Sequence, residues 1–400
     1  MGPLGGRGAQ RSMEKAVSSA ESFTSGRPIA VDFAAIEREL AAMWKEAGQT
    51  APGETLPPVM HACLLNMMVC CPEPACAGRA TKTIAEVTRV HPARVLMAVV
   101  DPSAAGDRLD ASITAHCTLA PGAKSGPRVC CEEISILASF AALPRLPGVL
   151  LPLLLPDLPV VLWWPDEPHL EWPLSRGLTG ASDLIVVDSR RFGDPAAQFR
   201  RLAALARPIA DLSWHRSRGW RELAAGMFDG PAFEEYPARI ERVTVESSAG
   251  PASARGAGTF CAEGMLLGAW VASRLKWHPA PLLSTTGPAR GDASARFPLA
   301  RADGGKAEII LQQVPSEDTP GRITALRLEA FDASFELRRA WVADCVTTSV
   351  TMPDTCPVPR TARVAERDEA TLLCRILQSA GHDVIYEDAL HLAARVLGPK

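Results

Sequence analysis

One apolar stretch, LPLLLPDLPVVLWWPDEP at residues 151–168, limits what this chain can fold into. A membrane-spanning helix needs about 20 apolar residues, and the apolar part here, residues 149–164, is shorter. It is also interrupted by three prolines and one acid: Pro152, Pro156, Pro159 and Asp157. Each proline inside a helix removes a hydrogen bond and costs roughly 3 kcal/mol. The stretch therefore excludes a helix over 152–159 and predicts a short buried strand, PVVLWW, at 159–164.

The end of this strand is a candidate binding site. Open α/β sheets bind ligands at the carboxyl ends of their strands. Four residues lie at this end and are candidates for the rim of a ligand or partner site: Trp163, Trp164, Asp166 and Glu167. The alternative is that the tryptophans fill the core and that the acids are solvated loop residues.

The composition is that of a globular protein without an obvious charged partner. Hydrophobic residues make up 47% of the chain and charged residues 22%, which are ordinary values. The formal net charge is −3 and the basic residues are dispersed, so we expect no nucleic-acid partner. The first residues are polar and glycine-rich and lack the apolar segment of a secretory signal, so we expect a cytoplasmic protein without a membrane partner.

The pattern of apolar residues predicts two domains, as the 400-residue length allows. Strands alternate with helices in the first part, which predicts an α/β N-terminal domain with a mostly parallel sheet. Alternating apolar and polar residues in the second part predict an α+β C-terminal domain with an antiparallel sheet. The expected divisions are a flexible tail (1–28), a helix with Asp32 as its N-cap and a linker (29–54), the α/β domain (55–230) and the α+β domain (231–400).

Motifs for common cofactors and catalytic groups are missing. No phosphate-binding P-loop, nucleophile elbow, HExxH zinc motif or EF-hand loop occurs. GAGTFC at 256–261 has Cys261 where a dinucleotide motif needs its third glycine, and no strand precedes it. We therefore predict no catalytic residues, no cofactor and no metal, and binding rather than catalysis.

Polar residues follow a second short strand at 183–188. Asp188, Ser189 and Arg190 come directly after it, and serine and arginine side chains donate hydrogen bonds to anions such as phosphate. DLSWH at 211–215 and GWRE at 219–222 also mix tryptophan with charge. The alternative for each string is strand-end capping and salt bridging.

The chain contains eleven cysteines, which we expect to be mostly reduced. Five lie in or near two strands and are candidates for a redox-responsive group: Cys70, Cys71, Cys76, Cys130 and Cys131. Neighbouring cysteines of a strand point to opposite faces, which makes them poor ligands for one metal ion. The alternative is structural thiols, and we expect four others to be buried as small apolar residues: Cys63, Cys117, Cys261 and Cys374.

Three strings read in order resemble one family. PLLLPDLPVVLWWPDEP, DLIVVDSRRF and DLSWHRSRGWRELAAGMFD are similar to the corresponding parts of the OpcA family, the glucose-6-phosphate dehydrogenase assembly proteins. The resemblance runs from about residue 55 to the end of the chain. It implies a non-catalytic partner of glucose-6-phosphate dehydrogenase in the oxidative pentose phosphate pathway, which assists the assembly of that enzyme or activates it allosterically.

The resemblance suggests which residues contact the partner. Tryptophan and arginine are enriched in interface hot spots, so we expect a partner surface or ligand pocket at Trp163, Trp164, Trp214, Trp220 and Arg221. The alternative is that the tryptophans fill the core. Two other functions stay open: a sugar-phosphate-binding enzyme that uses Asp188, Ser189 and Arg190, and a thiol-based redox sensor that acts on a partner.

Overall fold

The computed structural model describes most of the chain as two compact units. The described residues are 21–24, 33–47, 59–119, 128–249, 260–280, 294–316, 318–340, 344–353, 357–379 and 381–398. The first unit takes in those up to Pro165, with His169–Ile185 and Leu373–Gln378. The second takes in Asp166–Pro168, Val186–Leu372 and those from Ser379 onward. The chain thus passes from one unit to the other after Ile185, earlier than the boundary predicted near residue 230.

The first unit contains the mostly parallel sheet that the sequence predicts. Its strand order is β1-β5-β6-β4-β3-β7, and β2 also pairs with β6. Parallel pairing joins β3 to β4 and β7, and β6 to β4 and β2, whereas β5 is antiparallel to β1 and β6. The bounds are β1 (Glu21–Thr24), β2 (Val59–His61), β3 (Leu65–Cys71), β4 (Ala93–Asp101), β5 (Leu109–Leu119), β6 (Arg128–Ser139) and β7 (Val160–Trp163).

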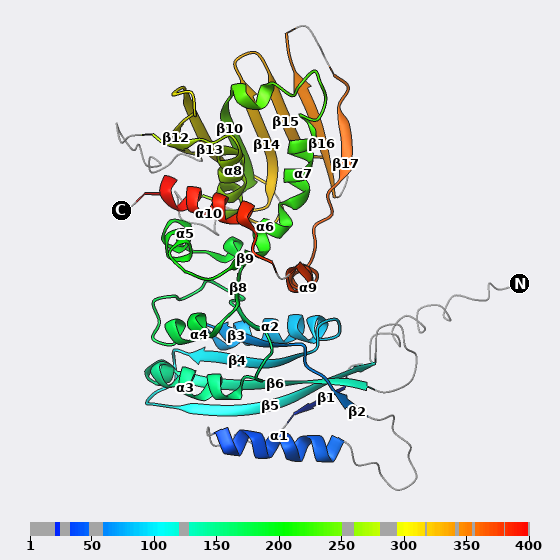
Figure 1. The fold of residues 1–400 in the computed structure, drawn as a ribbon, viewed down its shortest axis with the longest axis vertical. Coiled ribbons are helices and arrows are strands. Elements are labelled where there is room, and N and C mark those ends of the chain that lie inside the picture. The colour runs from blue at the N-terminus through cyan, green and yellow to red at the C-terminus, as the bar shows by residue number, and fades with distance from the viewer. Residues whose placement is uncertain are drawn as a thin grey trace, which may run out of the picture. The chain divides into compact units, whose positions relative to one another are not determined.

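Helices cover both faces of this sheet. Glu132 and Glu133 are successive residues of β6 and point to opposite faces. Glu132 accepts a hydrogen bond from Trp44 of α1 (Phe33–Ala47), and Glu133 accepts one from Thr81 of α2 (Pro74–Val87). All seven residues of β3 are buried, as expected for a strand covered on both faces. Figure 1 shows α1 in blue beside this sheet.

The proline-rich stretch forms the predicted strand, but a 3-10 turn enters the range 152–159 from which the sequence excluded a helix. A helical turn, α3 (Leu146–Leu150), runs into a 3-10 turn (Leu151–Leu153), and β7 begins just after Pro159. Asn66 of β3 fixes the segment between them: its Oδ1 accepts from the Leu155 N–H (2.8 Å) and its Nδ2 donates to the Leu155 carbonyl (2.9 Å). In the described part of the chain, no helix combines the length and the apolar character needed to cross a membrane.

Short elements follow β7 along the chain. They are α4 (Ser175–Ala181), β8 (Leu184–Val187), a 3-10 turn (Ser189–Arg191), α5 (Pro195–Ala203), β9 (Ile209–Asp211), α6 (Leu212–Arg216) and α7 (Arg218–Gly226). Asp194 caps α5 by accepting from the Ala197 N–H (3.0 Å), as its place before Pro195 predicts. The sequence did not predict α6, which begins directly at the end of β9.

The second unit contains the predicted antiparallel sheet with one parallel pair. Its order is β11-β12-β13-β10-β14-β15-β16-β17, and β10 is parallel to β13. The strands are β10 (Ile240–Ser248), β11 (His278–Pro279), β12 (Ser294–Ala300), β13 (Lys306–Val314), β14 (Ile323–Ala330), β15 (Ser334–Arg339), β16 (Cys345–Thr351) and β17 (Arg360–Arg363). Val243 and Val245 of β10 are buried, whereas Arg242 is exposed, so the alternation of the sequence gives one apolar face.

A helix rich in small residues packs on the apolar face of this sheet. α8 (Ala262–Arg274) contacts β10 and β13. A Cβ atom added to Gly268 would lie 2.9 Å from Cγ2 of Ile309, so the helix lies too close to the sheet for a larger residue there. Two further helices, α9 (Glu369–Ser379) and α10 (Val384–Val396), follow the sheet along the chain and match the two predicted C-terminal helices.

Three local predictions need correction or fall outside the description. Residues 59–71 are a nearly unbroken apolar run, which predicts one buried strand, but the chain leaves the strand conformation at 62–64 and forms β2 and β3. Residues 21–24, assigned to the flexible tail, form β1 and pair with β5. The rest of the predicted tail and the predicted N-cap Asp32 lie outside the described residues.

Candidate functional site: a buried arginine and carboxylate cluster

The residues after β8 and β9 meet in a buried ion pair of the second unit. Asp188 directly follows β8, and its carboxylate accepts two hydrogen bonds from the Arg216 guanidinium, at 2.7 and 2.6 Å. The Ser213 hydroxyl (2.8 Å) and the Arg190 N–H (3.2 Å) also donate to Asp188. The Asp188 side chain is 2% exposed. Although burial alone would raise it, the pKa of Asp188 is lowered because Arg216 and Ser213 favour the ionised form.

A second buried carboxylate lies beside this pair. Asp211 ends β9 and begins α6, where its Oδ1 accepts from the N–H groups of Ser213 (2.8 Å) and Ser189 (3.1 Å). Its Oδ2 has no hydrogen-bond partner among the described residues. Burial first, and then the negative charge of Asp188, raise the pKa of Asp211 to about 7. Asp211 therefore titrates near neutral pH.

A third group of charges extends the cluster toward the C-terminal sheet. Arg190 donates from Nε (3.0 Å) and Nη2 (2.6 Å) to one carboxylate oxygen of Glu263, in the first turn of α8. Its Nη1 donates to Glu366 (2.9 Å), whose other oxygen pairs with Nε of Arg322 (2.8 Å). Burial raises the pKa of Glu263, although Arg190 and Arg216 oppose this shift. One cluster thus joins residues from the turn after β8, from α6 and α8, and from the segments just before β14 and just after β17.

These arginines line a small pocket. Its walls come from the side chains of Arg190, Arg216, Trp220, Glu263, Arg322, Ile323 and Arg339, and from the segment 364–366. The cavity has a volume of about 20 Å³. This is room for roughly one water molecule.

Trp214, Trp220 and Arg221 lie close to the cluster but form no exposed aromatic patch. Trp214 and Trp220 are each 2% exposed. The indole of Trp214 donates to Asp383 (2.8 Å), and the guanidinium carbon of Arg221 lies 3.2 Å from the centre of its ring. Burial lowers the pKa of Arg221 to about 10. The two tryptophans fill the core, as the alternative expected, and a role for them or Arg221 in partner binding stays a prediction.

The residues at the end of β7 do not form a common rim. Trp163 and Trp164 are fully buried in the first unit. Glu167 instead caps the chain before α5 in the second unit: it accepts from the Gly193 N–H (2.9 Å) and from Nε2 of Gln198 (2.8 Å). Asp166 is partly exposed. The two tryptophans at the end of β7 therefore pack in the core, and Glu167 is a cap. A role for these residues in binding stays a prediction.

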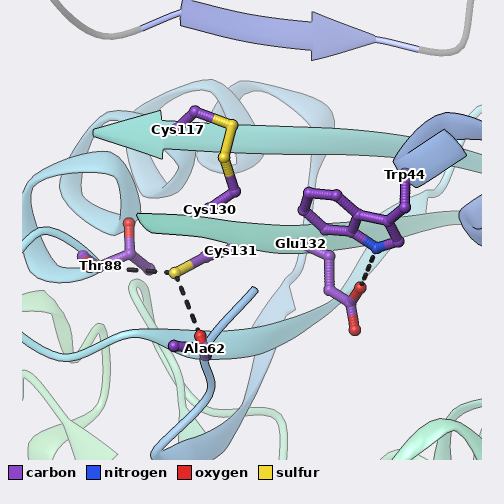
Figure 2. Close-up of a disulfide and its surroundings, with 7 residues drawn as sticks. All are labelled: Trp44, Ala62, Thr88, Cys117, Cys130, Cys131 and Glu132. Atoms are coloured by element: carbon purple, nitrogen blue, oxygen red, sulfur yellow. Dashed lines mark hydrogen bonds between the residues drawn. A yellow bond between two sulfur atoms is a disulfide. The ribbon is translucent and has the colours of Figure 1, made fainter. Parts of the chain in front are cut away.

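The cysteines of the first unit differ from the expected pattern in one respect. Cys117 of β5 and Cys130 of β6 face each other across the antiparallel pair and form a disulfide, with Cα atoms 4.1 Å apart. Cys117 is therefore not the reduced apolar residue that the sequence predicts. Cys261 is buried as predicted, whereas Cys63 and Cys374 are partly exposed. Figure 2 shows this disulfide on one side of β6 and Cys131 on the other, where its thiol contacts the carbonyls of Ala62 and Thr88.

The remaining redox candidates are inaccessible. Cys70, Cys71 and Cys76 are fully buried. Burial, with a contribution from Cys76, holds the pKa of Cys70 well above its usual value, and burial raises the pKa of Cys131 to about 11. Redox sensors need exposed thiols with lowered pKa, whereas all four thiols are buried and the pKa values of Cys70 and Cys131 are raised. Within the described ranges, no group of histidines, cysteines and carboxylates could hold a metal ion.

Five members of the cluster were missed by the sequence analysis, and one of them, Arg216, lies within the family string at 211–229. Glu263, Arg322, Arg339 and Glu366 come from elements far along the chain. One signal was present, because Glu263 is a lone acid at the start of the otherwise apolar helix AEGMLLGAW. Arg322, Arg339 and Glu366 carried no such signal, because charged residues occur at alternate positions along most strands of the second sheet.

Comparison with known proteins identifies the family. Residues 84–204 match the model for the glucose-6-phosphate dehydrogenase subunit N-terminal domain, and residues 207–390 match the model for its C-terminal domain. Together the matches cover most of the chain. The chain belongs to the OpcA family. The buried cluster is built largely from the C-terminal match, whereas Asp188 and Arg190 lie in the N-terminal one.

Curated OpcA proteins of cyanobacteria are similar to the chain. It is 27% identical over 332 residues to the OxPP cycle protein OpcA of Nostoc punctiforme, with 78% of this chain and 66% of the relative covered. It is 29% identical over 317 residues to that of Synechococcus elongatus, with 74% and 66% covered. The matched part spans slightly less than two thirds of the length of these relatives.

Solved structures resemble the chain weakly. A 3-ketoreductase from Actinomadura kijaniata has a TM-score of 0.44 and 13% identity, over 83% of this chain and 95% of that one. An NAD-binding oxidoreductase from Klebsiella pneumoniae has a TM-score of 0.45 and 12% identity, over 83% and 94%. Similarity at this level carries no information about cofactor or activity.

Proposed function

We propose that this chain is a non-catalytic assembly factor and allosteric activator of glucose-6-phosphate dehydrogenase, acting in the cytoplasm in the oxidative pentose phosphate pathway. The observation that carries the proposal is the match of both halves of the chain to domains described as subunits of that enzyme. The curated relatives, named for the OxPP cycle, support the same pathway.

The arrangement of the charged cluster supports a role other than catalysis. Both oxygens of Asp188 are occupied by Arg216, and the side chain is 2% exposed. A general base must reach a substrate proton at hydrogen-bond distance, and Asp188 has no exposed oxygen to do so. Ser189 is fully buried as well. These residues hold the strand ends together, which fits a protein whose surface acts on another protein.

The activation that we propose is a shift of population. A partner that binds the active oligomer of the dehydrogenase better than its inactive form favours the active form by the difference in binding free energy. A tenfold preference corresponds to about 1.4 kcal/mol. Such a factor needs no catalytic group of its own.

Sedimentation of a mixture tests the assembly role. We expect the purified chain and glucose-6-phosphate dehydrogenase of the same cell to sediment as one complex, and the dehydrogenase oligomer to persist at lower concentrations when the chain is present. Separate sedimentation of the two proteins, with an unchanged oligomer, would contradict the proposal.

Two variants in the same experiment test the predicted partner residue Arg221. Arg221→Ala should weaken the complex, whereas Arg218→Ala, which removes an exposed arginine of the same helix, should not. If both variants bind like the original chain, Arg221 is not an interface residue. This outcome leaves the assembly role untouched, because that role is tested by the binding of the original chain.

A redox sensor and a sugar-phosphate enzyme are the alternatives, and the first is tested by the same mixture. A sensor predicts that oxidant changes the affinity for the dehydrogenase and that Cys70→Ser, Cys71→Ser and Cys76→Ser remove the response. The buried positions of these thiols favour no response. The enzyme alternative predicts turnover of a hexose phosphate by the isolated chain, lost in Asp188→Ala.

A further inference from the structure

Two arginines of the pocket have a buried donor that makes no hydrogen bond to the described residues: Arg339 through Nη1 and Arg322 through Nε, which is only ion-paired with Glu366. Nη1 of Arg339, at the end of β15, is buried and has no hydrogen-bond partner among the described residues. Its Nε donates to the Ile323 carbonyl (3.3 Å), and its guanidinium carbon lies 5.7 Å from the centre of the Trp220 ring. Burial and the neighbouring Arg322 lower the pKa of Arg339. An unpaired buried guanidinium donor costs free energy. A ligand that accepted a hydrogen bond from Nη1 would offset this cost.

The other arginines of the pocket have partners that fall into two kinds. Arg216 is held by Asp188 and Arg190 by Glu263, and both carboxylates are nearly fully buried. Arg322 pairs with Asp318 (2.9 Å), while Asp344 lies 3.9 Å away. All three arginines line the cavity.

Glu366 is a partner of the second kind. Its carboxylate bridges Nη1 of Arg190 and Nε of Arg322, and its side chain is 32% exposed. It belongs to the connection between β17 and α9 rather than to a helix or strand. The segment 364–366 packs against α7, since a Cβ atom added to Gly219 would lie 2.7 Å from the Val364 side chain. Glu366 can therefore leave the pocket without breaking a regular element.

The geometry points to a phosphate-binding site in this pocket, which takes inorganic phosphate or the phosphate group of a monoester and from which Glu366 is displaced. A phosphate monoester carries a charge of about −1.5 to −2 at pH 7 and three strong acceptor oxygens. Arginine forks match these oxygens in geometry and charge. The group would accept from Arg190 and Arg322, in place of Glu366, and from the unpaired Nη1 of Arg339.

The size of the cavity explains why Glu366 must move. About 20 Å³ holds roughly one water molecule and not a phosphate group. Once the carboxylate leaves, its own volume is added and one negative charge is removed from between two arginines. Glu366 thus acts as an internal anion that keeps the site closed, and the site stands independently of the function proposed above.

Calorimetric titration of the full chain with inorganic phosphate tests the site. Chloride keeps the ionic strength constant, and glucose 6-phosphate is titrated in a second arm. We expect saturable phosphate binding that becomes about tenfold tighter in Glu366→Gln and at least tenfold weaker in Arg339→Met. Tighter binding of glucose 6-phosphate would show that the sugar is also recognised, and equal binding would show that the phosphate group suffices.

Arg338→Met is the matched control. Arg338 is the neighbouring residue of β15, points to the opposite face and pairs with Glu246 and Glu336 there. Its loss should leave phosphate binding unchanged. An equal loss in Arg338→Met and Arg339→Met would mean a general effect of charge and would overturn the site. Absence of saturable binding in both the original chain and Glu366→Gln would overturn it as well.

A second readout follows the displaced segment. The Val364 N–H donates to the Asp344 carbonyl (2.6 Å) and ties the segment to the start of β16. We expect phosphate to speed hydrogen exchange at Val364 in the original chain. Unchanged exchange at saturating phosphate would contradict the displacement of Glu366. If Arg339→Met fails to fold, Arg339→Lys keeps the charge without the fork and should bind phosphate several times more weakly.

Discussion

The carboxylate of Asp188 and the guanidinium of Arg216 form a two-bond ion pair that is almost completely buried. Asp188 comes from the end of β8 and Arg216 from the end of α6, so the pair joins two of the family strings. A buried pair of this kind contributes little against an apolar pair of the same shape, but losing one partner leaves a buried charge.

Asp188→Asn should therefore destabilise the chain strongly. The asparagine keeps the size of the side chain but leaves Arg216 without an opposite charge, and the expected loss in the free energy of unfolding is about 3–5 kcal/mol. Urea unfolding followed by circular dichroism measures it. Glu222→Gln breaks the exposed pair with Arg218 and should cost under about 0.5 kcal/mol. Similar losses of unfolding free energy in the two variants would show that the burial of Asp188 does not increase the cost of its substitution.

The stability of the chain should depend on pH through Asp211. Its pKa is about 7 in the folded chain and about 3.9 in an unfolded one. Between these values the folded state keeps a proton that the unfolded state has lost, so the free energy of unfolding falls as pH rises from 4 to 7. Asp188, whose pKa is lowered, acts in the opposite direction and only below pH 4.

Asp211→Asn isolates this effect. The amide oxygen can accept from Ser189 and Ser213 as the carboxylate does, and the side chain no longer ionises. The variant should be close to the original chain in stability at pH 4 and more stable by on the order of 4 kcal/mol at pH 8. Urea titrations at both pH values measure this, and a constant difference would contradict the raised pKa.

The close approach of α8 to its sheet makes Gly268 intolerant of substitution. In Gly268→Ala the new methyl group would lie 2.9 Å from Cγ2 of Ile309, and the resulting strain should cost about 1–3 kcal/mol. Gly78, inside α2, has no atom within 4 Å of such a methyl group. Gly78→Ala should therefore stabilise the chain, by up to about 1 kcal/mol. Thermal unfolding of the two variants compares them, and equal shifts would contradict the packing.

The disulfide between Cys117 and Cys130 predicts a difference in thiol count. Chain unfolded without reductant should show two fewer reactive thiols than chain reduced first, and peptide mass spectrometry should find the two cysteines linked. The sequence separation is 13 residues, so removing the link should cost up to about 3 kcal/mol of unfolding free energy. Equal thiol counts in the two samples would show that the pair is reduced.

Much of the fold could be predicted from the sequence because apolar periodicity is local. Apolar and polar residues alternate in β10 and β13–β16, which predicted the antiparallel sheet, and the apolar run of β3 predicted the parallel one. Three prolines predicted where β7 begins. α6 was missed because its five residues are too few for a helical period. The pairing of Cys117 with Cys130 depends on the register of two strands, which the spacing of the cysteines alone does not set.

The candidate site could be predicted only in part. Asp188, Ser189 and Arg190 were found because they follow a strand, and the capping and ion-pair alternative describes their contacts. Arg339 and Glu366 reach the same pocket from β15 and from the segment after β17, and sequence reasoning had no means to bring these distant residues together. The sequence also left open whether Trp214 and Trp220 lie in the core or at a binding surface, because tryptophan is common in both.

Kinetics of glucose-6-phosphate dehydrogenase, measured with and without this chain, test the central claim most directly. Initial rates against glucose 6-phosphate would be recorded at increasing concentrations of the chain, with the chain alone as the control for intrinsic turnover. We expect no turnover by the chain alone, and a saturable fall in KM or rise in maximal rate for the dehydrogenase. Unchanged KM and maximal rate at all concentrations would contradict the account.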